Sequence, residues 1–141
     1  MKILLLNGVN LNMLGKRDSN YYGTDTLPQL EEKLRTYAKD LGVTLTCAQS
    51  NVEGELVNML QTTDCDAVVF NAGAYSHYSY ALRDCIECIS VPVAEVHMSN
   101  IYEREQFRHV DVLADVCVAQ FYGKGIDSYI EAIDYFAKNK I

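Results

Sequence analysis

A small set of side chains in this sequence carries the groups that an acid–base enzyme without metal or cofactor needs. They are Arg17, Tyr22, His77, Glu95, His97, Arg104 and Arg108. Arginine binds carboxylates through paired hydrogen bonds, and positive charge beside a tyrosine favours the phenolate, which can remove a proton next to a carbonyl. A histidine can then protonate a departing hydroxyl. These groups are compatible with elimination of water from a hydroxy-ketone acid.

Asparagines lie between an apolar run and the loop that holds two of these groups. The run "KILLLNGVNL" is followed by "NMLGKRDSNYYG", which contains Asn12, Arg17 and Tyr22. Side chains such as Asn7 and Asn10 need hydrogen-bond partners if the run is a buried strand. They could hold an enolate oxygen, directly or through water. The loop is therefore interpreted as a ligand loop, with a solvated surface as the alternative.

The strands that would position these residues are five largely apolar runs. They are "KILLLNG", "VTLTCAQ", "DAVVFNAG", "VPVAEVH" and "DVCVAQFYG". Near-continuous apolar runs are typical of parallel strands that are covered on both faces. The runs therefore predict a parallel sheet between two layers of helices.

Start signals place helices between these runs. Thr26–Gln29 has the pattern of a capping box with Pro28 in the first turn, and Gly42 ends that helix. Ser50–Glu53 has the pattern of a second capping box before "EGELVNMLQ". Further helices are predicted within "YSYALRDCIECI" and "DSYIEAIDYFAKN", and a short helix or turn within "EREQFRH". This alternation predicts a flavodoxin-like three-layer α/β/α fold, with a five-stranded parallel sheet in the order 2-1-3-4-5.

Polar clusters follow three of the predicted strands. "NGVNLN" ends the first strand, "NAGAYSH" the third and "EVHMSN" the fourth. In doubly wound sheets ligands bind beyond the carboxyl ends of the strands, near the point where the strand order reverses. The sequence therefore predicts one site at this edge of the sheet.

Length, charge and cysteine content narrow the class of protein. The 141 residues are consistent with a single domain, 1–141, and the net charge of -7 argues against nucleic acid as the main partner. The start "MKILLLNG" is too short for a signal peptide, and no segment is long enough to span a membrane. The 5 cysteines are odd in number and irregular in spacing, which favours reduced thiols in the cytoplasm.

Several motifs also have plainer interpretations. Cys85 and Cys88 form a C-x-x-C pattern, which could be a redox pair, but it falls within an apolar helical stretch where core packing is the alternative. The histidines lack the spacing of a zinc site, and lone histidines are often structural. The glycines match neither a dinucleotide nor a P-loop motif. A flavodoxin-like module that binds a flavin or phosphate at the same edge stays as an alternative function.

Long motifs along nearly the whole chain resemble the type II 3-dehydroquinate dehydratases. The motifs are "LLLNGVNLNMLG", "QSNVEGEL", "NAGAYSHYSYALRD", "VPVAEVHMSN" and "EREQFRH". The resemblance implies a lyase that reversibly eliminates water from 3-dehydroquinate in the anti sense. The product would be 3-dehydroshikimate, formed through an enolate, and no cofactor or metal is implied.

The resemblance also implies roles for individual residues. Tyr22 matches the base, Arg17 the lid arginine that keeps this tyrosine ionisable, His97 the general acid, and Asn10 the residue that holds a water near the enolate oxygen. Supporting roles fall to Glu95, which orients or tunes His97, and to Arg104, a second arginine near the tyrosine. The implied substrate-binding residues are Asn71, His77, Asp84, Met98, Ser99 and Arg108.

Assembly and departures from the family pattern complete this set of expectations. The resemblance implies trimers assembled into a dodecamer, with Asp84 reaching the site of a neighbouring subunit. Val9 and Ala72 stand where the family usually or often has proline, which would leave two strand-end turns looser. Val52 replaces a usual histidine, where it would change an interface or supporting contact, and Tyr78 adds bulk near His77.

Overall fold

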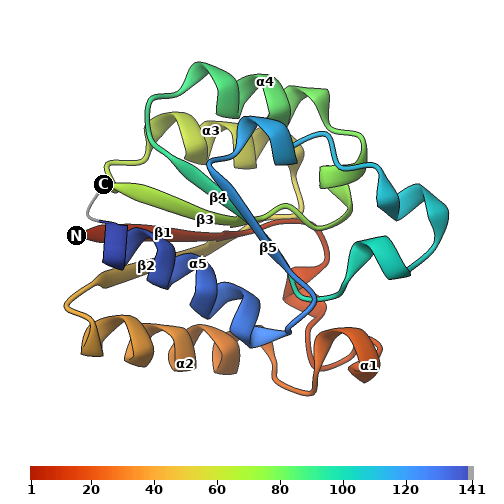
Figure 1. The fold of residues 1–141 in the computed structure, drawn as a ribbon, viewed down its shortest axis with the longest axis horizontal. Helices are drawn as coiled ribbons and strands as arrows, with labels where there is room; N and C mark the ends of the chain where they lie inside the picture. Colours follow the sequence, from red (N-terminus) through yellow and green to blue (C-terminus); the bar gives the residue numbers. More distant parts are fainter. Residues whose placement is uncertain (140–141) are drawn as a thin grey trace.

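The centre of the molecule is a parallel five-stranded sheet. The computed structural model describes residues 1–139 and orders the strands β2-β1-β3-β4-β5. In chain order the strands are β1 (Lys2–Asn7), β2 (Thr44–Gln49), β3 (Ala67–Asn71), β4 (Val93–His97) and β5 (Ala119–Tyr122). Figure 1 shows helices on both sides of this sheet. The predicted fold class and strand order are therefore confirmed.

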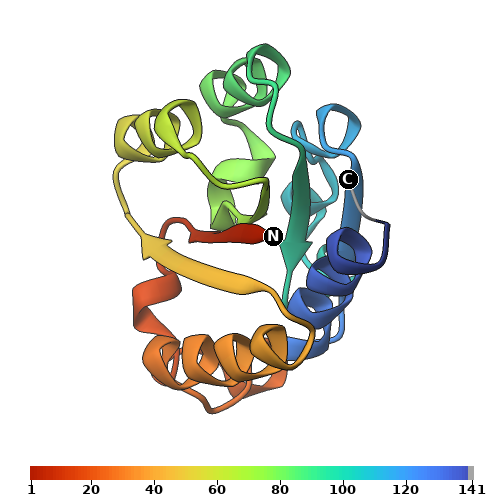
Figure 2. The ribbon, with the colours of Figure 1, turned by 90° about the vertical axis from the view of Figure 1, so that its left-hand side faces the viewer.

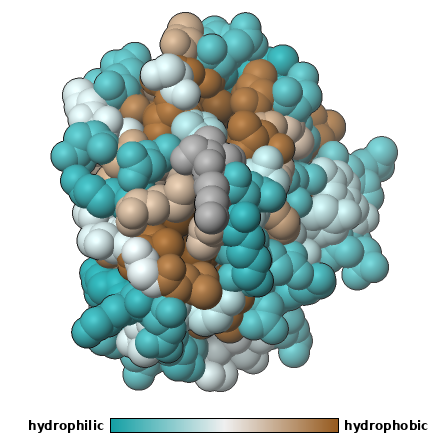
Figure 3. All heavy atoms as spheres, turned by 60° about the vertical axis from the view of Figure 1, so that its left-hand side comes forward, coloured by the Kyte–Doolittle hydropathy of each residue, from teal (hydrophilic) through white to brown (hydrophobic). Residues whose placement is uncertain are grey.

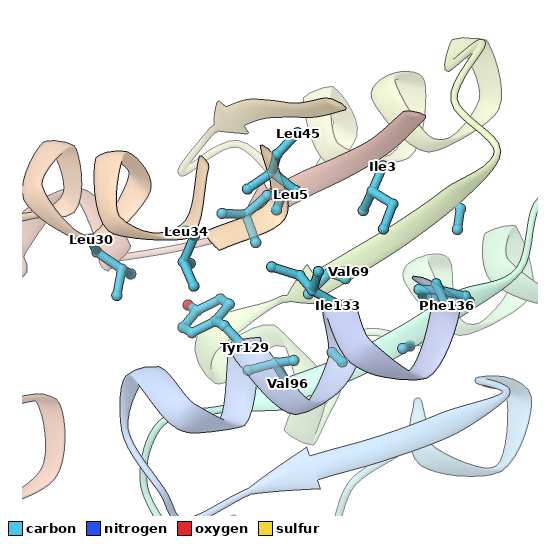
Figure 4. Close-up of a cluster of buried hydrophobic side chains, with 14 of the residues drawn as sticks. Ile3, Leu5, Leu30, Leu34, Leu45, Val69, Val96, Tyr129, Ile133 and Phe136 are labelled. Carbon is cyan, nitrogen blue, oxygen red and sulfur yellow. The ribbon is translucent and has the colours of Figure 1, made fainter. Parts of the chain in front are cut away.

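Two pairs of helices cover the two faces of the sheet. Helices α2 (Leu27–Asp40) and α5 (Ile126–Asn139) lie on one face, and α3 (Glu53–Thr62) and α4 (Tyr80–Cys88) lie on the other (Figures 1 and 2). Each pair closes a separate hydrophobic core against the strands. Figure 4 shows the core beneath α2 and α5, where the labelled side chains are Ile3, Leu5, Leu30, Leu34, Leu45, Val69, Val96, Tyr129, Ile133 and Phe136.

The edge strand β5 is shorter and less buried than the central strands β3 and β4. The residues of β3 and β4 are all buried, whereas those of β5 are only partly buried or exposed. The predicted fifth strand was too long, because a 3-10 turn, η5 (Ala114–Val116), occupies its first part. There the N–H groups of Val116 and Cys117 donate to the carbonyl of Leu113, at 3.1 and 3.2 Å, and not to a neighbouring strand.

One predicted capping box is present and the other was wrong. Thr26 Oγ1 accepts from Gln29 N, and Gln29 Oε1 accepts from Thr26 N, as predicted for α2. Helix α3 instead begins after Val52, which offers no side-chain cap. The hydroxyl of Ser50 accepts from Val52 N and donates to Glu55. The second box fails because its hydroxyl has these other partners.

The surface near the two chain ends lies opposite the loops that follow the strands. Figure 3 shows this face, on which hydrophobic residues lie between hydrophilic ones. Within residues 1–139, none of the helices has both the length and the apolar character to cross a membrane. The helices are amphipathic coverings of the sheet.

Short helical segments gather at the carboxyl edge of the sheet. They are α1 (Ser19–Tyr22), η1 (Leu11–Met13), η2 (Gly73–His77), η3 (Ile101–Glu103) and η4 (Gln106–His109). Figure 1 shows α1 and the segment around residues 101–109 projecting on the side where the strands end. The "EREQFRH" motif ends in the short 3-10 helix η4, in agreement with the predicted short helix or turn.

Candidate active site

A pocket opens at the carboxyl edge of the sheet, where the loops after β1, β3 and β4 meet the loop that contains α1. Its cavity of about 90 Å³ is well below the roughly 300–1,000 Å³ of sites for drug-sized ligands, so it suits a small molecule better than a flavin. The predicted site residues that line it are Asn10, Arg17, Tyr22, Asn71, His77, His97, Met98, Ser99, Arg104 and Arg108.

The turns after β1 and β3 interlock at the base of the pocket. Gly8 N donates to the carbonyl of Asn71 at 2.7 Å. A Cβ at Gly8 would lie 2.5 Å from the carbonyl oxygen of Ala72, and one at Gly73 would lie 2.5 Å from that of Val9. Such contacts are too close for any side chain, so both turns require glycine. Val9 and Ala72, where looser turns were expected, lie within this close backbone contact.

A buried tyrosine of α5 joins the ends of β1 and β3. Tyr129 Oη donates to Asn7 Oδ1 at 2.7 Å and accepts from Asn71 Nδ2 at 2.8 Å. Asn71 Oδ1 also accepts from Gly73 N. The side-chain oxygens of both strand-end asparagines are therefore paired, whereas the buried Asn7 Nδ2 has no hydrogen-bond partner among the described residues. One hydrogen of Asn71 Nδ2 stays available for a ligand.

Two arginines surround Tyr22, the half-buried tyrosine of α1. The guanidinium carbon of Arg17 lies 3.7 Å from the centre of the Tyr22 ring, and Arg104 Nη1 donates to the Tyr22 hydroxyl at 2.6 Å. Burial lowers the pKa of Arg17, although Tyr22 opposes the shift. We call Arg17, Tyr22 and Arg104 the cationic cluster. It places positive charge on both the ring face and the oxygen of the tyrosine.

Arg104 connects the end of β4 with α1. The same Nη1 atom donates to Ser99 Oγ at 3.1 Å, and the guanidinium also covers the ring of Tyr21. Its Nε atom is buried and has no hydrogen-bond partner among the described residues. The resemblance implied only a supporting role for Arg104, yet its guanidinium makes the hydrogen bond to the phenol oxygen, whereas Arg17 stacks on the ring.

Elsewhere at the site, His97 contacts two carboxylates. Successive odd residues of β4 face the same side of the sheet, so Glu95 Oε2 lies 2.9 Å from His97 Nε2. Asp111 Oδ2 lies 3.4 Å from the same nitrogen. The side chains of all three are at most 6% exposed. We call Glu95, His97 and Asp111 the anionic cluster; sequence reasoning missed Asp111.

Burial and mutual contact shift the protonation of the anionic cluster. Burial raises the pKa of Glu95 to about 7, although His97 opposes it. Burial alone would lower the pKa of His97, but contacts with Asp111 and Glu95 outweigh burial and raise it to about 9. Burial also disfavours ionisation of Asp111, yet contacts with His97 and Glu95 keep its pKa below its usual range. His97 is therefore an imidazolium at neutral pH.

His77 stacks on His97 but has the opposite protonation preference. The ring centres are 6.2 Å apart and nearly parallel. His77 Nδ1 lies 2.8 Å from the carbonyl of Val110, which can only accept, so Nδ1 carries the hydrogen. Burial lowers the pKa of His77, and the charges of His97 and Arg108 add to this. Neutral His77 thus offers Nε2 as an acceptor beside a charged neighbour.

Other residues singled out in the sequence lie outside this pocket. Asp84 is exposed on α4, and Val52 and Tyr78 are 54% and 60% exposed. Cys85 is buried in the core while Cys88 is exposed. Burial raises the pKa of the Cys85 thiol, which is the opposite of the activation that a redox cysteine needs.

The anionic cluster is also a possible donor set for a metal ion. The ligand atoms of Glu95, His97 and Asp111 all lie within 4.8 Å of one another. Asp111 already accepts from Leu113 N at 2.9 Å and from Gln120 Nε2 at 2.9 Å. A protonated His97 between the two carboxylates accounts for the short contacts without a cation.

The fold and pocket define a class: a flavodoxin-like α/β protein with an acid–base site at the carboxyl edge of its sheet. Comparison with known proteins is more specific. The model of the family described as "Dehydroquinase class II" matches residues 1–137. The chain therefore belongs to the class II dehydroquinase family.

Individual relatives are similar over almost their whole length. The chain is 52% identical to a 3-dehydroquinate dehydratase of Bacillus licheniformis, over 95% of this chain and 94% of the relative. It is 50% identical to one of Pelotomaculum thermopropionicum, over 94% of both. The solved type II dehydroquinase of Butyrivibrio crossotus superposes with a TM-score of 0.92 at 44% identity, covering 96% of both chains.

Proposed function

We propose that the pocket catalyses the reversible anti elimination of water from 3-dehydroquinate, through an enolate, to give 3-dehydroshikimate. Family membership and the names of the relatives support 3-dehydroquinate dehydratase activity. The observation that carries the mechanism is the contrast between Tyr22, which is surrounded by cations, and His97, which is surrounded by carboxylates. One side of the pocket is suited to accept a proton and the other to donate one.

Tyr22 is proposed as the base that removes the proton next to the ketone. The hydrogen bond from Arg104 and the guanidinium of Arg17 over the ring both favour negative charge on the phenol. The hydroxyl oxygen has lone pairs besides the one used by Arg104. Asn10, at the pocket wall, is proposed to hold a water that stabilises the enolate oxygen.

His97 is proposed as the general acid that protonates the departing hydroxyl. Its Nε2 lies against both carboxylates, so Nδ1 is the nitrogen left to donate a proton toward the pocket. Contacts with Asp111 and Glu95 outweigh burial and raise the pKa of His97 to about 9. His97 therefore keeps this proton until the hydroxyl leaves. At neutral pH the proposed acid is thus still protonated and can donate.

The remaining pocket residues are proposed to bind substrate. Met98 and Ser99 follow β4 beside Arg104 and would receive the carboxylate of the substrate. Asn71 has an amide hydrogen and His77 an Nε2 acceptor available for ring hydroxyls. Arg108, held by Glu105 at 2.9 Å, would contact a hydroxyl from the other side.

Assembly and location are also proposals. The exposed position of Asp84 on α4 is compatible with a contribution to the site of a neighbouring subunit in a dodecamer built from trimers. The five cysteines are free in the structure, which suits a reducing cytoplasm. We propose a single catalytic domain for the whole chain; residues 140–141 of it lie outside the described residues. Light scattering coupled to gel filtration would measure the assembly directly.

The first test is an absorbance assay for the conjugated enone product, with 3-dehydroquinate as substrate and a chelator present. We expect turnover that the chelator does not change. Tyr22→Phe and His97→Ala should each lower kcat by about 10²–10⁴-fold, the usual contribution of a general base or acid. Full activity of folded Tyr22→Phe would refute the assigned base, and loss of wild-type turnover with chelator would favour a metal at the anionic cluster.

A further inference from the structure

We propose that Asp111 is a positioning residue, which holds His97 as an imidazolium and directs its Nδ1 atom into the pocket. The proposal rests on the general-acid role proposed for His97. Asp111 lies in the stretch between η4 and η5, outside the strand that carries Glu95 and His97. It is absent from the pocket wall, so it would act through His97 and not on the substrate.

The contacts of Asp111 fix its carboxylate on three sides. Oδ1 accepts from the backbone N–H of Leu113 at 2.9 Å. Oδ2 accepts from Gln120 Nε2 at 2.9 Å and lies 3.4 Å from His97 Nε2. The side chain is only 2% exposed. These three donors take the place of most of the hydrogen bonds that the ionised carboxylate of Asp111 would make to water.

Glu95 is much less well solvated than Asp111. Its Oε2 contacts His97, while its Oε1 is buried and has no hydrogen-bond partner among the described residues. Two buried carboxylates at one site cannot both ionise freely, and the extra proton goes to the one with fewer donors. The donor count therefore makes Asp111 the permanent negative charge beside His97 and Glu95 the group that gains or loses a proton.

Other charged and titratable groups around the cluster do not replace Asp111. His77 of η2 stacks on His97, and the charge of Arg108 of η4 lies on the same side. His77 is neutral and Arg108 is a cation, so neither supplies the negative charge that favours an imidazolium at His97. Tyr102 of η3 and Cys117, before β5, are neutral groups: burial raises the pKa of both, and the two carboxylates add to the shift. The negative charge that favours the imidazolium thus comes from Asp111 and Glu95.

Position on the ring matters as much as charge. Glu95 and Asp111 approach the same nitrogen, Nε2, from different elements of the fold. Glu95 comes from β4 itself, and Asp111 is held from β5 through Gln120. Two contacts on one nitrogen restrict rotation of the imidazole. Loss of Asp111 would therefore affect proton donation in the reaction more than substrate binding.

The experiment is a histidine titration by NMR, with 13Cε1-labelled histidine, on the whole protein and on Asp111→Asn. His97→Ala assigns the signal, and Asp115→Asn removes an exposed carboxylate of the same segment as a matched control. We expect the midpoint of His97 to fall by at least about one pH unit in Asp111→Asn, a tenfold loss of proton affinity. It should not move in Asp115→Asn. In the dehydratase assay at pH 8, kcat of Asp111→Asn should fall about tenfold, with KM within about twofold of wild type.

A second variant guards against a folding defect. Asp111→Ser also removes the charge, and its hydroxyl can still accept from the N–H two residues on. An unchanged His97 midpoint in either folded variant, beside an active wild-type enzyme, would overturn the role of Asp111 and leave the proposed function standing. A lowered midpoint with an inactive wild type would support the contact with His97 but overturn its use in catalysis.

Discussion

The cationic and anionic clusters of the pocket are built in opposite ways. In the cationic cluster, Arg17 and Tyr22 lie on the loop that contains α1, and Arg104 reaches them from the loop after β4. In the anionic cluster, Glu95 and His97 belong to a central strand whose residues are all buried. One half of the proposed acid–base pair is therefore carried on a surface loop, and the other is part of the core of the sheet.

The proposed reaction requires that substrate can enter the pocket and that the acid keeps its proton, and the two clusters suit different ones of these requirements. A loop with few buried contacts can open and close, as entry of a substrate into so small a cavity requires. A buried carboxylate–imidazolium cluster keeps its proton because water cannot compete for it. The proposed base thus lies in a short helix with no buried residues, and the proposed acid lies in a strand whose residues are all buried.

Among the residues that support the proposed base and acid, the two arginines of the cationic cluster should have the largest effect. Arg17→Met and Arg104→Met should each lower kcat by about 10²-fold, since each removes positive charge from beside the same tyrosine, Tyr22. Because they share one partner, the double variant should lose less than the product of the two single losses. Steady-state kinetics of the four proteins provide the double-mutant cycle. Simple multiplication of the two effects would show that the arginines serve different groups.

A smaller, pH-dependent loss of kcat is expected when Glu95 of the anionic cluster is changed. Burial raises the pKa of Glu95 to about 7, so Glu95 is mostly neutral below that pH and mostly ionised above it. Glu95→Gln should therefore change kcat little at pH 6 and lower it by up to about tenfold at pH 9, where wild type has the extra charge beside His97. A loss that is equal at both values would contradict this titration of Glu95.

The smallest effect is a change of stability with pH. The pKa of His97 is raised from 6.5 to about 9 in the folded protein, so between these values the folded state holds a proton that the unfolded chain has lost. The free energy of unfolding should fall as pH rises, by up to about 1.4 kcal/mol per pH unit. The melting temperature should drop by several degrees between pH 7 and 8.5.

His97→Asn is the control for this stability measurement. It lacks the titrating imidazole, so its melting temperature should fall less over the same range. The scan ends at pH 8.5 because burial also raises the pKa of Cys47 to about 11 and that of Cys117 still further. A slope as steep in His97→Asn as in wild type would assign the effect to other groups.

The fold could be predicted because its signals are local. The runs quoted for β1, β3 and β4 contain each whole strand and exceed it by one to three residues, and the capping box at Thr26 is completed within four residues. The errors arose where a competing partner a few residues away takes the predicted hydrogen bond. The Ser50 hydroxyl donates to Glu55 of α3 and so does not form the predicted capping box. The start of β5 is set by the turn at the buried Leu113, whose carbonyl accepts from Val116 and Cys117.

The pocket was predictable where residues follow strands, and Asp111 was missed because it does not. His97 and Glu95 end β4, whereas Asp111 reaches them across two 3-10 segments and with the help of Gln120. Its only local signal is an acid among apolar neighbours in "HVDVL". Arg104 was found, but no sequence pattern could show that its guanidinium makes the hydrogen bond to the Tyr22 oxygen.

The hydroxyl of Tyr129 also constrains the order of events while the chain is being made. Asn7 and Asn71 emerge from the ribosome long before Tyr129, yet both depend on its hydroxyl in the finished fold. Until residue 129 is available, closing β1 against β3 would leave two amide side chains without these partners, at a cost in free energy. The base of the pocket is therefore completed late in translation, after its own strands have been synthesised.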